Sequence, residues 1–138
     1  MTTGFDLVLD AKCALGECPL WSVAEQVLYF VDIKQKRIHR FDPADGSLGT
    51  IDLPEEVGCI GLAKEAGFVA GLRSGIWLIS PEGKLARKLA DNPEDQTISR
   101  FNDGMVDPAG RFIAGTVDET RERGIASLYR YDARGLQK

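Results

Sequence analysis

Two short stretches of the chain hold polar side chains at places where packing gives little reason for them. Residues 15–21 set the carboxylate of Glu17 just before a proline and an aromatic residue. Residues 100–116 bring Arg100, Asn102 and two aspartates to the start of an apolar segment. Both stretches also have simple structural interpretations, the first as a surface loop and the residues after Arg100 as β-turns.

Short β-strands are the elements that must position these side chains. β-branched and aromatic residues dominate three pairs of segments, and Asp, Pro and Gly form turn signals between them. The sequence therefore predicts strands over residues 27–33, 37–41, 68–72, 75–79, 111–116 and 127–131.

The predicted strands recur as a repeat of about 40–45 residues, which is the length of a four-stranded propeller blade. An apolar strand opens each unit, at residues 19–21, 60–62 and 104–106. We therefore predict an all-β fold, namely a β-propeller with about three blades in this chain. A β-sandwich is the alternative.

A ring of this kind typically closes with about four to eight blades, because an open ring leaves sheet edges and blade faces bare. We therefore expect residues 1–138 to form one partial propeller domain. It would be completed either by self-association through exposed blade edges or by further chain beyond Lys138.

Composition and charge argue against several classes of function. The 138 residues carry a formal net charge of −4 at pH 7, and the basic residues are scattered. Neither nucleic acid nor an anionic membrane is therefore expected as a partner. No apolar run is long enough to cross a bilayer, and the N-terminus lacks the pattern of a secretory signal. Cys13, Cys18 and Cys59 show no CxxC spacing, which indicates reduced thiols and a cytoplasmic protein.

Both polar stretches match signatures of a known family. Residues 15–21 have the pattern Leu-Gly-Glu-x-Pro-x-Trp, and residues 100–111 have the pattern Arg-x-Asn-Asp-Gly-x-x-Asp-Pro-x-Gly-Arg. In this order and spacing they resemble the two N-terminal signatures of the senescence-marker-protein/gluconolactonase/regucalcin family. The resemblance covers essentially the whole chain in register, and it is to the N-terminal half of a sugar lactonase.

The resemblance implies a six-bladed propeller with one divalent cation at the mouth of its central channel. Glu17 would be a ligand of this cation; Ca²⁺, Mg²⁺ and Mn²⁺ suit oxygen ligands, and Zn²⁺ is tolerated by some relatives. Arg100 and Asn102 would face the sugar lactone. Glu119, with Asp118 as the alternative, would also contact it. The remaining metal ligands of the family, one of which is its usual candidate for the general base, would lie beyond residue 138.

The function implied is hydrolysis of a sugar lactone to the aldonic acid. The cation would polarise the lactone carbonyl or lower the pKa of a bound water, and Arg100 would stabilise developing charge or hold a hydroxyl. Two alternatives stay open. One is a calcium-binding, regucalcin-like protein, and the other is a catalytically incomplete propeller fragment.

Several other residues have structural interpretations. His39 alternates on a predicted strand and is expected to be an exposed structural residue. Cys13 has no evident ligand partner in the sequence. Trp21, Trp77 and the tyrosines are expected in the blade core. Asp32 is expected in a turn or an interblade hydrogen bond.

Overall fold

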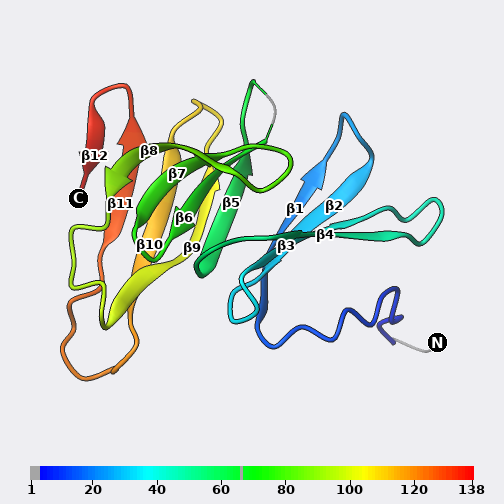
Figure 1. Ribbon diagram of the computed structural model, residues 1–138, viewed down its shortest axis with the longest axis horizontal. Helices are drawn as coiled ribbons and strands as arrows, with labels where there is room; N and C mark the ends of the chain where they lie inside the picture. Colours follow the sequence, from blue (N-terminus) through cyan, green and yellow to red (C-terminus); the bar gives the residue numbers. More distant parts are fainter. Residues whose placement is uncertain (1–3, 66) are drawn as a thin grey trace.

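The computed structural model describes residues 4–65 and 67–138. These residues form three four-stranded antiparallel sheets and no helix, and thus no helix that could span a lipid bilayer. Within each sheet the strands lie side by side in chain order (Figure 1). The strands are β1 (Gly16–Ser22), β2 (Val27–Asp32), β3 (Arg37–Phe41), β4 (Leu48–Asp52), β5 (Val57–Leu62), β6 (Phe68–Leu72), β7 (Gly75–Ile79), β8 (Leu85–Asp91), β9 (Ser99–Val106), β10 (Phe112–Asp118), β11 (Leu128–Asp132) and β12 (Gly135–Gln137).

The first strand of each sheet lies where the three sheets meet. β5 contacts both β1 and β9, and β1 also contacts β9. Three sheets that converge on their first strands have the arrangement of consecutive propeller blades. The predicted three-unit repeat is therefore confirmed, and the six predicted strands occur close to their expected bounds.

Glycines allow the second and third sheets to approach closely. A Cβ atom at Gly58 would lie 2.2 Å from the carbonyl oxygen of Phe101 and 2.5 Å from that of Asn102. A Cβ atom at Gly71 would lie 2.8 Å from the Phe101 Cβ atom. No larger residue fits at such distances without a backbone shift. This packing fixes the stretch of β9 that carries Arg100 and Asn102.

Two apolar clusters join the sheets. The first lies between the first and second sheets, where the rings of Tyr29 and Phe68 meet edge to face with centroids 5.0 Å apart. The second joins the second and third sheets around Phe101, whose ring centroid lies 6.0 Å from that of Tyr129. Burial of apolar surface is the main favourable term in folding, so these clusters hold the blades in order.

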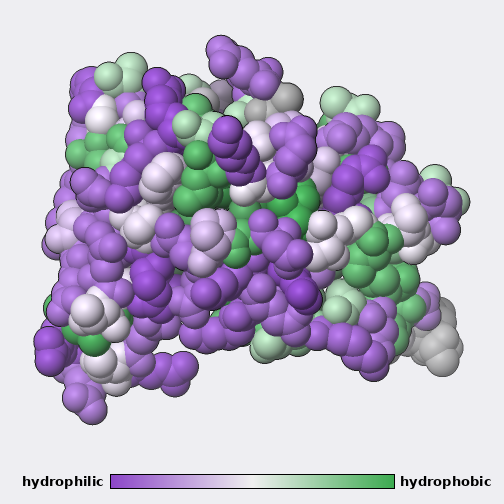
Figure 2. Space-filling model, viewed as in Figure 1, coloured by the Kyte–Doolittle hydropathy of each residue, from purple (hydrophilic) through white to green (hydrophobic). Residues whose placement is uncertain are grey.

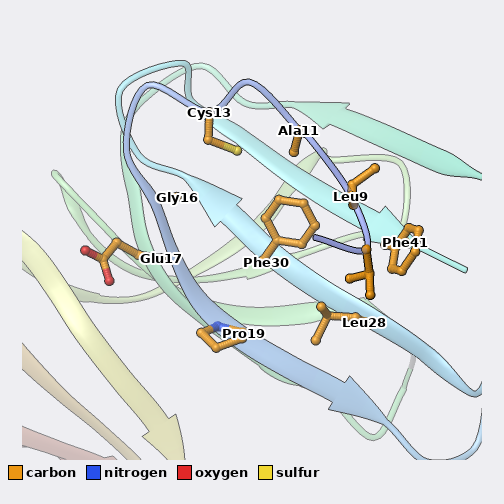
Figure 3. Close-up of a pocket in the computed structure, with 10 residues that line it drawn as sticks. Leu9, Ala11, Cys13, Gly16, Glu17, Pro19, Leu28, Phe30 and Phe41 are labelled. Atoms are coloured by element: carbon orange, nitrogen blue, oxygen red, sulfur yellow. The ribbon is translucent and has the colours of Figure 1, made fainter. Parts of the chain in front are cut away.

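The face of the first sheet that points away from the second sheet is partly covered by the segment before β1 (Figure 1). A cavity of about 350 Å³ lies between this segment and the sheet, with Leu28, Phe30 and Phe41 in its wall (Figure 3). Phe5 and Leu7 in the segment are exposed. Figure 2 shows a largely hydrophilic face with apolar patches near its middle and on the side of the first sheet.

Two expectations about single residues are wrong. His39 is only 4% exposed, because its ring packs against Phe30, with centroids 4.9 Å apart, on the face that the N-terminal segment covers. Trp21 is 44% exposed and does not belong to the blade core. The expectation for Asp32 is confirmed, since its carboxylate accepts a hydrogen bond from the backbone N–H of Gln35 in a turn.

Candidate functional site

Glu17 lies at an irregularity of β1. The pairing of β1 with β2 shifts register between Glu17 and Leu20, and Cys18 adopts a left-handed backbone conformation with φ of 52°. Bulges and strained residues of this kind re-aim side chains and concentrate near functional sites. The Glu17 side chain is exposed and points away from the apolar cavity (Figure 3). Within residues 4–65 and 67–138, no hydrogen bond or ion pair engages its carboxylate.

Cys18 joins the three inner strands next to Glu17. Its Sγ atom accepts a hydrogen bond from the Ile60 backbone N–H at 3.3 Å and lies 3.9 Å from the Gly104 carbonyl oxygen. Burial raises the pKa of the Cys18 thiol, and the nearby charges of Asp103 and Glu17 act in the same direction. A neutral, enclosed thiol is a structural contact and not an activated nucleophile.

Arg100 holds two of the predicted substrate residues together. It is 5% exposed, and its Nη1 donates to the Phe101 carbonyl oxygen at 3.1 Å and to Asn102 Oδ1 at 2.9 Å. Its Nε lies 3.4 Å from Glu119 Oε1, as an ion pair without hydrogen-bond geometry. Arg100, Asn102 and Glu119 therefore form one group. The interpretation of Asn102 as part of a turn is wrong, because it lies inside β9.

Glu119 also belongs to a larger set of charged side chains. Its carboxylate lies 2.6 Å from Arg73 Nη2 and 3.4 Å from Lys34 Nζ. Glu56 lies 2.8 Å from Lys34 Nζ and accepts a hydrogen bond from Arg73 Nε at 2.9 Å. We call this set the charged cluster; its members are Lys34, Glu56, Arg73, Arg100 and Glu119.

Sequence reasoning missed Lys34, Glu56 and Arg73. The three residues are far apart in the sequence and come from two repeats: Lys34 follows β2 in the first, and Glu56 precedes β5 and Arg73 follows β6 in the second. In antiparallel pairs the start of one strand lies beside the end of the next, so all three are at the blade end where β1 and β9 begin. A charged residue follows the second strand in successive repeats, Lys34 after β2 and Arg73 after β6. This recurrence was the sequence signal that could have identified them.

The cations of the charged cluster lower the pKa of both its carboxylates. Partial burial raises the pKa of Glu119, but the hydrogen bond and charge of Arg73 outweigh this effect. Burial likewise raises the pKa of Glu56, and the hydrogen bonds from Lys34 and Arg73 outweigh it. Both carboxylates are therefore ionised at neutral pH and can accept hydrogen bonds from hydroxyl groups.

The carboxylate of Asp118, the alternative to Glu119, forms its hydrogen bonds within its own loop. Its Oδ1 accepts hydrogen bonds from the backbone N–H of Thr120 at 3.0 Å and from the Thr120 hydroxyl at 2.6 Å. Its Oδ2 accepts one from the Arg123 backbone N–H at 2.7 Å. Mainly because of these Thr120 and Arg123 bonds, the pKa of Asp118 falls to about 2. Glu119 is thus the carboxylate that faces the charged cluster.

A hollow of about 540 Å³ connects β1 and β9. Its wall includes Cys18 and Pro19 on β1 and Asn102, Asp103 and Met105 on β9. The residues next to Glu17 and the amide of Asn102 therefore border the same opening.

Comparison with known proteins fits this arrangement of strands and polar residues. A model of the SMP-30/gluconolactonase/LRE-like region matches residues 15–138. The chain belongs to this family. Both signature stretches lie inside the matched residues, and so do all five members of the charged cluster.

Relatives of known name match over most of this chain. It is 56% identical over 126 residues to 6-deoxy-6-sulfogluconolactonase of Pseudomonas putida and 33% identical over 129 residues to regucalcin of Xenopus laevis. These alignments cover 91% and 90% of this chain, but only 43% of each relative. The chain thus spans less than half the length of these relatives.

A solved structure shows the same fold. The calcium-binding regucalcin of Agrobacterium tumefaciens superposes with a TM-score of 0.83 at 22% identity, over 91% of this chain and 43% of that one. The predicted all-β propeller fold is therefore confirmed.

The residues of this family member fit a hard divalent cation only in part. The free carboxylate of Glu17 is the kind of oxygen ligand that such cations prefer. The Asn102 Oδ1 atom is already engaged by Arg100, and Asp103 Oδ1 accepts a hydrogen bond from the Gly104 backbone N–H at 2.8 Å. A hard cation takes about six or more oxygen ligands, counting waters. Glu17 can therefore contribute to such a site but cannot form it alone.

Proposed function

We propose that the protein hydrolyses a sugar lactone with the help of a divalent cation, and that this chain supplies one side of the site. The observation that carries the proposal is the grouping of Arg100, Asn102 and Glu119 at the blade end where Glu17 offers a free carboxylate. Membership of a family that includes a named lactonase supports it.

Each residue of the group has a distinct task in this proposal. A bound divalent cation supplies polarisation of the lactone carbonyl or a bound water of lowered pKa. Glu17 holds the cation. Asn102 uses its oxygen to accept from Arg100, which leaves its N–H donors for an oxygen of the lactone. Glu119 accepts a hydrogen bond from a lactone hydroxyl, and Arg100 positions both side chains.

The charge of the cluster favours a lactone that carries an acidic substituent. Lys34, Arg73 and Arg100 face only two carboxylates, so one positive charge is in excess. The Lys34 side chain is the most exposed of the three cations. A sulfonate on the sugar would complement this excess charge. The relative with 56% identity is named for such a substrate.

The direct test is turnover by a complete ring. We suggest a chimera in which residues 1–138 replace the aligned part of the Pseudomonas putida relative. Hydrolysis adds water, breaks the ester C–O bond of the lactone and releases a proton from the acid formed, so a pH-stat follows the reaction. The chimera is expected to hydrolyse 6-deoxy-6-sulfogluconolactone in Mn²⁺ or Ca²⁺ and to lose activity in a chelator.

The same measurement separates lactonase activity from calcium binding without turnover. A folded chimera that binds Ca²⁺ but hydrolyses none of the sulfonated and unsubstituted aldonolactones would favour the second function, for which the calcium-binding regucalcin of Agrobacterium tumefaciens provides the precedent. Activity that is unchanged after complete removal of divalent cations would contradict the metal-dependent proposal.

A further inference from the structure

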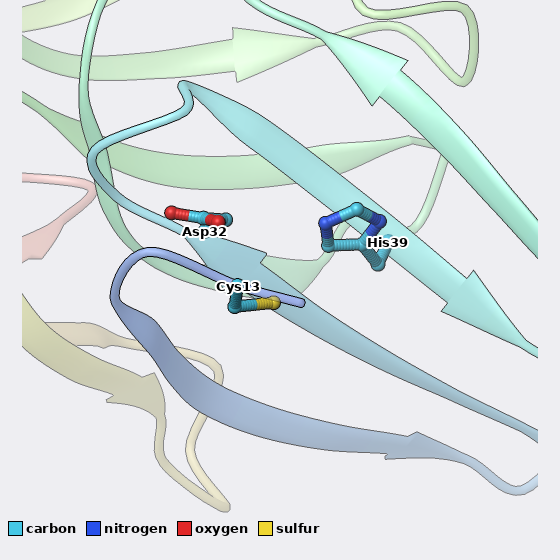
Figure 4. Close-up of side chains that lie close together, drawn as sticks. All are labelled: Cys13, Asp32 and His39. Atoms are coloured by element: carbon cyan, nitrogen blue, oxygen red, sulfur yellow. The ribbon is translucent and has the colours of Figure 1, made fainter. Parts of the chain in front are cut away.

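Three side chains of metal-ligating types meet on the covered face of the first sheet, and none of them belongs to the charged cluster. They are Cys13 from the loop before β1, Asp32 at the end of β2 and His39 in β3 (Figure 4). One ligand atom from each lies within 4.8 Å of the other two. The proposed lactonase function uses none of these residues.

His39 offers a free nitrogen at this place. Its Nδ1 lies 3.1 Å from the Thr50 hydroxyl oxygen, whereas its Nε2 is buried and has no hydrogen-bond partner among the described residues. Figure 4 shows one ring nitrogen turned toward Asp32. Burial lowers the pKa of His39, although the charge of Asp32 opposes this effect. A neutral ring that donates from Nδ1 to Thr50 keeps a lone pair on Nε2, as a metal-binding imidazole requires.

Asp32 is held rigidly, with one oxygen left incompletely used. Its Oδ1 accepts from the backbone N–H groups of Leu15 at 3.2 Å and Gln35 at 3.1 Å. Among the described residues, its Oδ2 accepts one backbone hydrogen bond, from the Ala14 N–H at 2.7 Å. A carboxylate oxygen can accept two bonds, so Oδ2 retains a position for a second partner.

Cys13 is seated beside this carboxylate by the local backbone. A Cβ atom at Gly16 would lie 3.2 Å from the Cys13 Cβ atom and 3.5 Å from its Sγ atom, so glycine leaves the space that the thiol side chain occupies. Partial burial and the charge of Asp32 raise the pKa of the Cys13 thiol. This argues against a Cys–His–Asp nucleophile, which needs a thiolate and a histidine free to act as base. A cation between the groups would instead stabilise the thiolate.

We propose that Cys13, Asp32 and His39 bind a transition-metal ion, and that Zn²⁺ is the ion which this donor set suits best. Thiolate, imidazole and carboxylate are the ligands of zinc sites, with water able to fill the fourth tetrahedral position. Thr50 fixes the histidine through its other nitrogen, as the outer partners of metal-binding histidines do. The ion would tie the loop before β1 to β2 and β3, at a site separate from Glu17.

The test is a titration of the 138-residue chain with Co²⁺, which reports a sulfur ligand through charge-transfer absorption in the near ultraviolet. We expect this absorption at one equivalent of Co²⁺, and displacement by Zn²⁺. Cys13→Ser should abolish it, and His39→Gln should weaken affinity more than roughly 100-fold, beyond the loss seen for outer-shell partners. Cys18→Ser and Glu17→Gln are the matched controls and should keep the band.

The pH dependence of Zn²⁺ affinity and the thermal unfolding midpoint test the site even if His39→Gln fails to fold. Binding displaces the Cys13 thiol proton, so affinity for Zn²⁺ should rise with pH. Zn²⁺ should also raise the thermal unfolding midpoint of the wild type and of Cys18→Ser, but not of Cys13→Ser, which alters a loop residue. Absence of the band in the folded wild type, or its persistence in Cys13→Ser, would overturn the assignment.

Discussion

Hydrogen bonds around Arg100 decide which polar groups of β9 remain free. The guanidinium group uses one nitrogen on the Phe101 carbonyl oxygen and on Asn102 Oδ1, and it faces Glu119 with another. Because Arg100 is buried, its main effect in this chain is to orient the two side chains beside it. In the proposed function, recognition of the substrate would therefore fall to the more exposed members of the charged cluster, and above all to Lys34.

Lys34→Met tests whether the charged cluster selects an acidic substrate. In the active chimera it should lower kcat/KM for the sulfonated lactone about tenfold more than for gluconolactone, which is about 1.4 kcal/mol of selective binding. Lys84→Met, at an exposed lysine on a turn, is the control and should leave the ratio unchanged. An equal loss of kcat/KM for both substrates would mean that Lys34 supports the site but does not recognise the sulfonate.

At the scale of strands, the ion pairs of the charged cluster connect the three sheets. Lys34 belongs to the first sheet, Glu56 and Arg73 belong to the second, and Glu119 belongs to the third. Arg73 also donates to the backbone carbonyl oxygen of Gln96 at 2.9 Å, in the segment that leads into β9. The positions of the candidate site residues therefore depend on contacts that cross from blade to blade.

Arg73→Met should destabilise the fold in a way that depends on pH. At pH 7 we expect a loss of about 1–2 kcal/mol, because two partly buried carboxylates lose their main partner. The pKa values of Glu56 and Glu119 are lowered in the folded state, so their ionised form stabilises it above the ordinary value of 4.5. That stabilisation disappears as pH falls through the lowered folded-state pKa values.

The difference in unfolding free energy between wild type and Arg73→Met should therefore shrink below pH 4.5, as measured by urea unfolding across a pH series. Arg87→Met, at an exposed arginine of β8, should show no such trend. A difference in unfolding free energy that stays constant down to acid pH would show that the charges of the cluster do not stabilise the contact between the sheets.

Gly58→Ala tests the close approach of β5 and β9. The added Cβ atom would meet two carbonyl oxygens of the backbone, which cannot move aside as a flexible side chain can, so we expect a loss of about 1–3 kcal/mol or more. Gly115→Ala is the matched control within a strand, since a Cβ atom there has no neighbour closer than 3.9 Å. Urea midpoints that move equally for both variants would contradict the packing described for β9.

At the scale of the whole molecule, three blades leave two sheet faces without a partner blade. Trp21 is exposed on the first sheet, and Met105 and Leu128 are exposed on the third. Exposed large apolar side chains on an uncovered sheet face favour association. We therefore expect the 138-residue chain to form larger species as its concentration rises in sedimentation velocity experiments. Leu128→Lys should reduce this association, and a wild type that stays monomeric at all concentrations would contradict the expectation.

Much of the fold could be predicted from local patterns. Segments such as residues 27–33 and 68–72 are rich in β-branched and aromatic residues because they lie between packed sheets. Four-stranded blades were predicted, but the residues that form the fourth strand were not located, because an outer strand such as β4 is mostly exposed and has no apolar alternation. Burial of His39 was also missed, since it depends on the N-terminal segment lying over the sheet.

The candidate site was predicted where its residues share a sequence signature, and missed where they do not. Arg100 and Asn102 lie within one strand, and their spacing is visible in the sequence. Lys34 and Arg73 reach the same place only through packing of separate repeats against one another, which no local pattern specifies. The position of Cys13 beside Asp32 and His39 likewise depends on tertiary contacts.

The measurement that tests the central claim most directly is the Mn²⁺ activation curve of the chimera with and without the Glu17 carboxylate. If Glu17 holds the cation, Glu17→Gln should abolish lactone hydrolysis or raise the half-activating Mn²⁺ concentration more than roughly 100-fold. Glu122→Gln, which removes an exposed carboxylate from the loop after β10, should leave the curve unchanged. A Glu17→Gln chimera with wild-type Mn²⁺ activation would contradict the account.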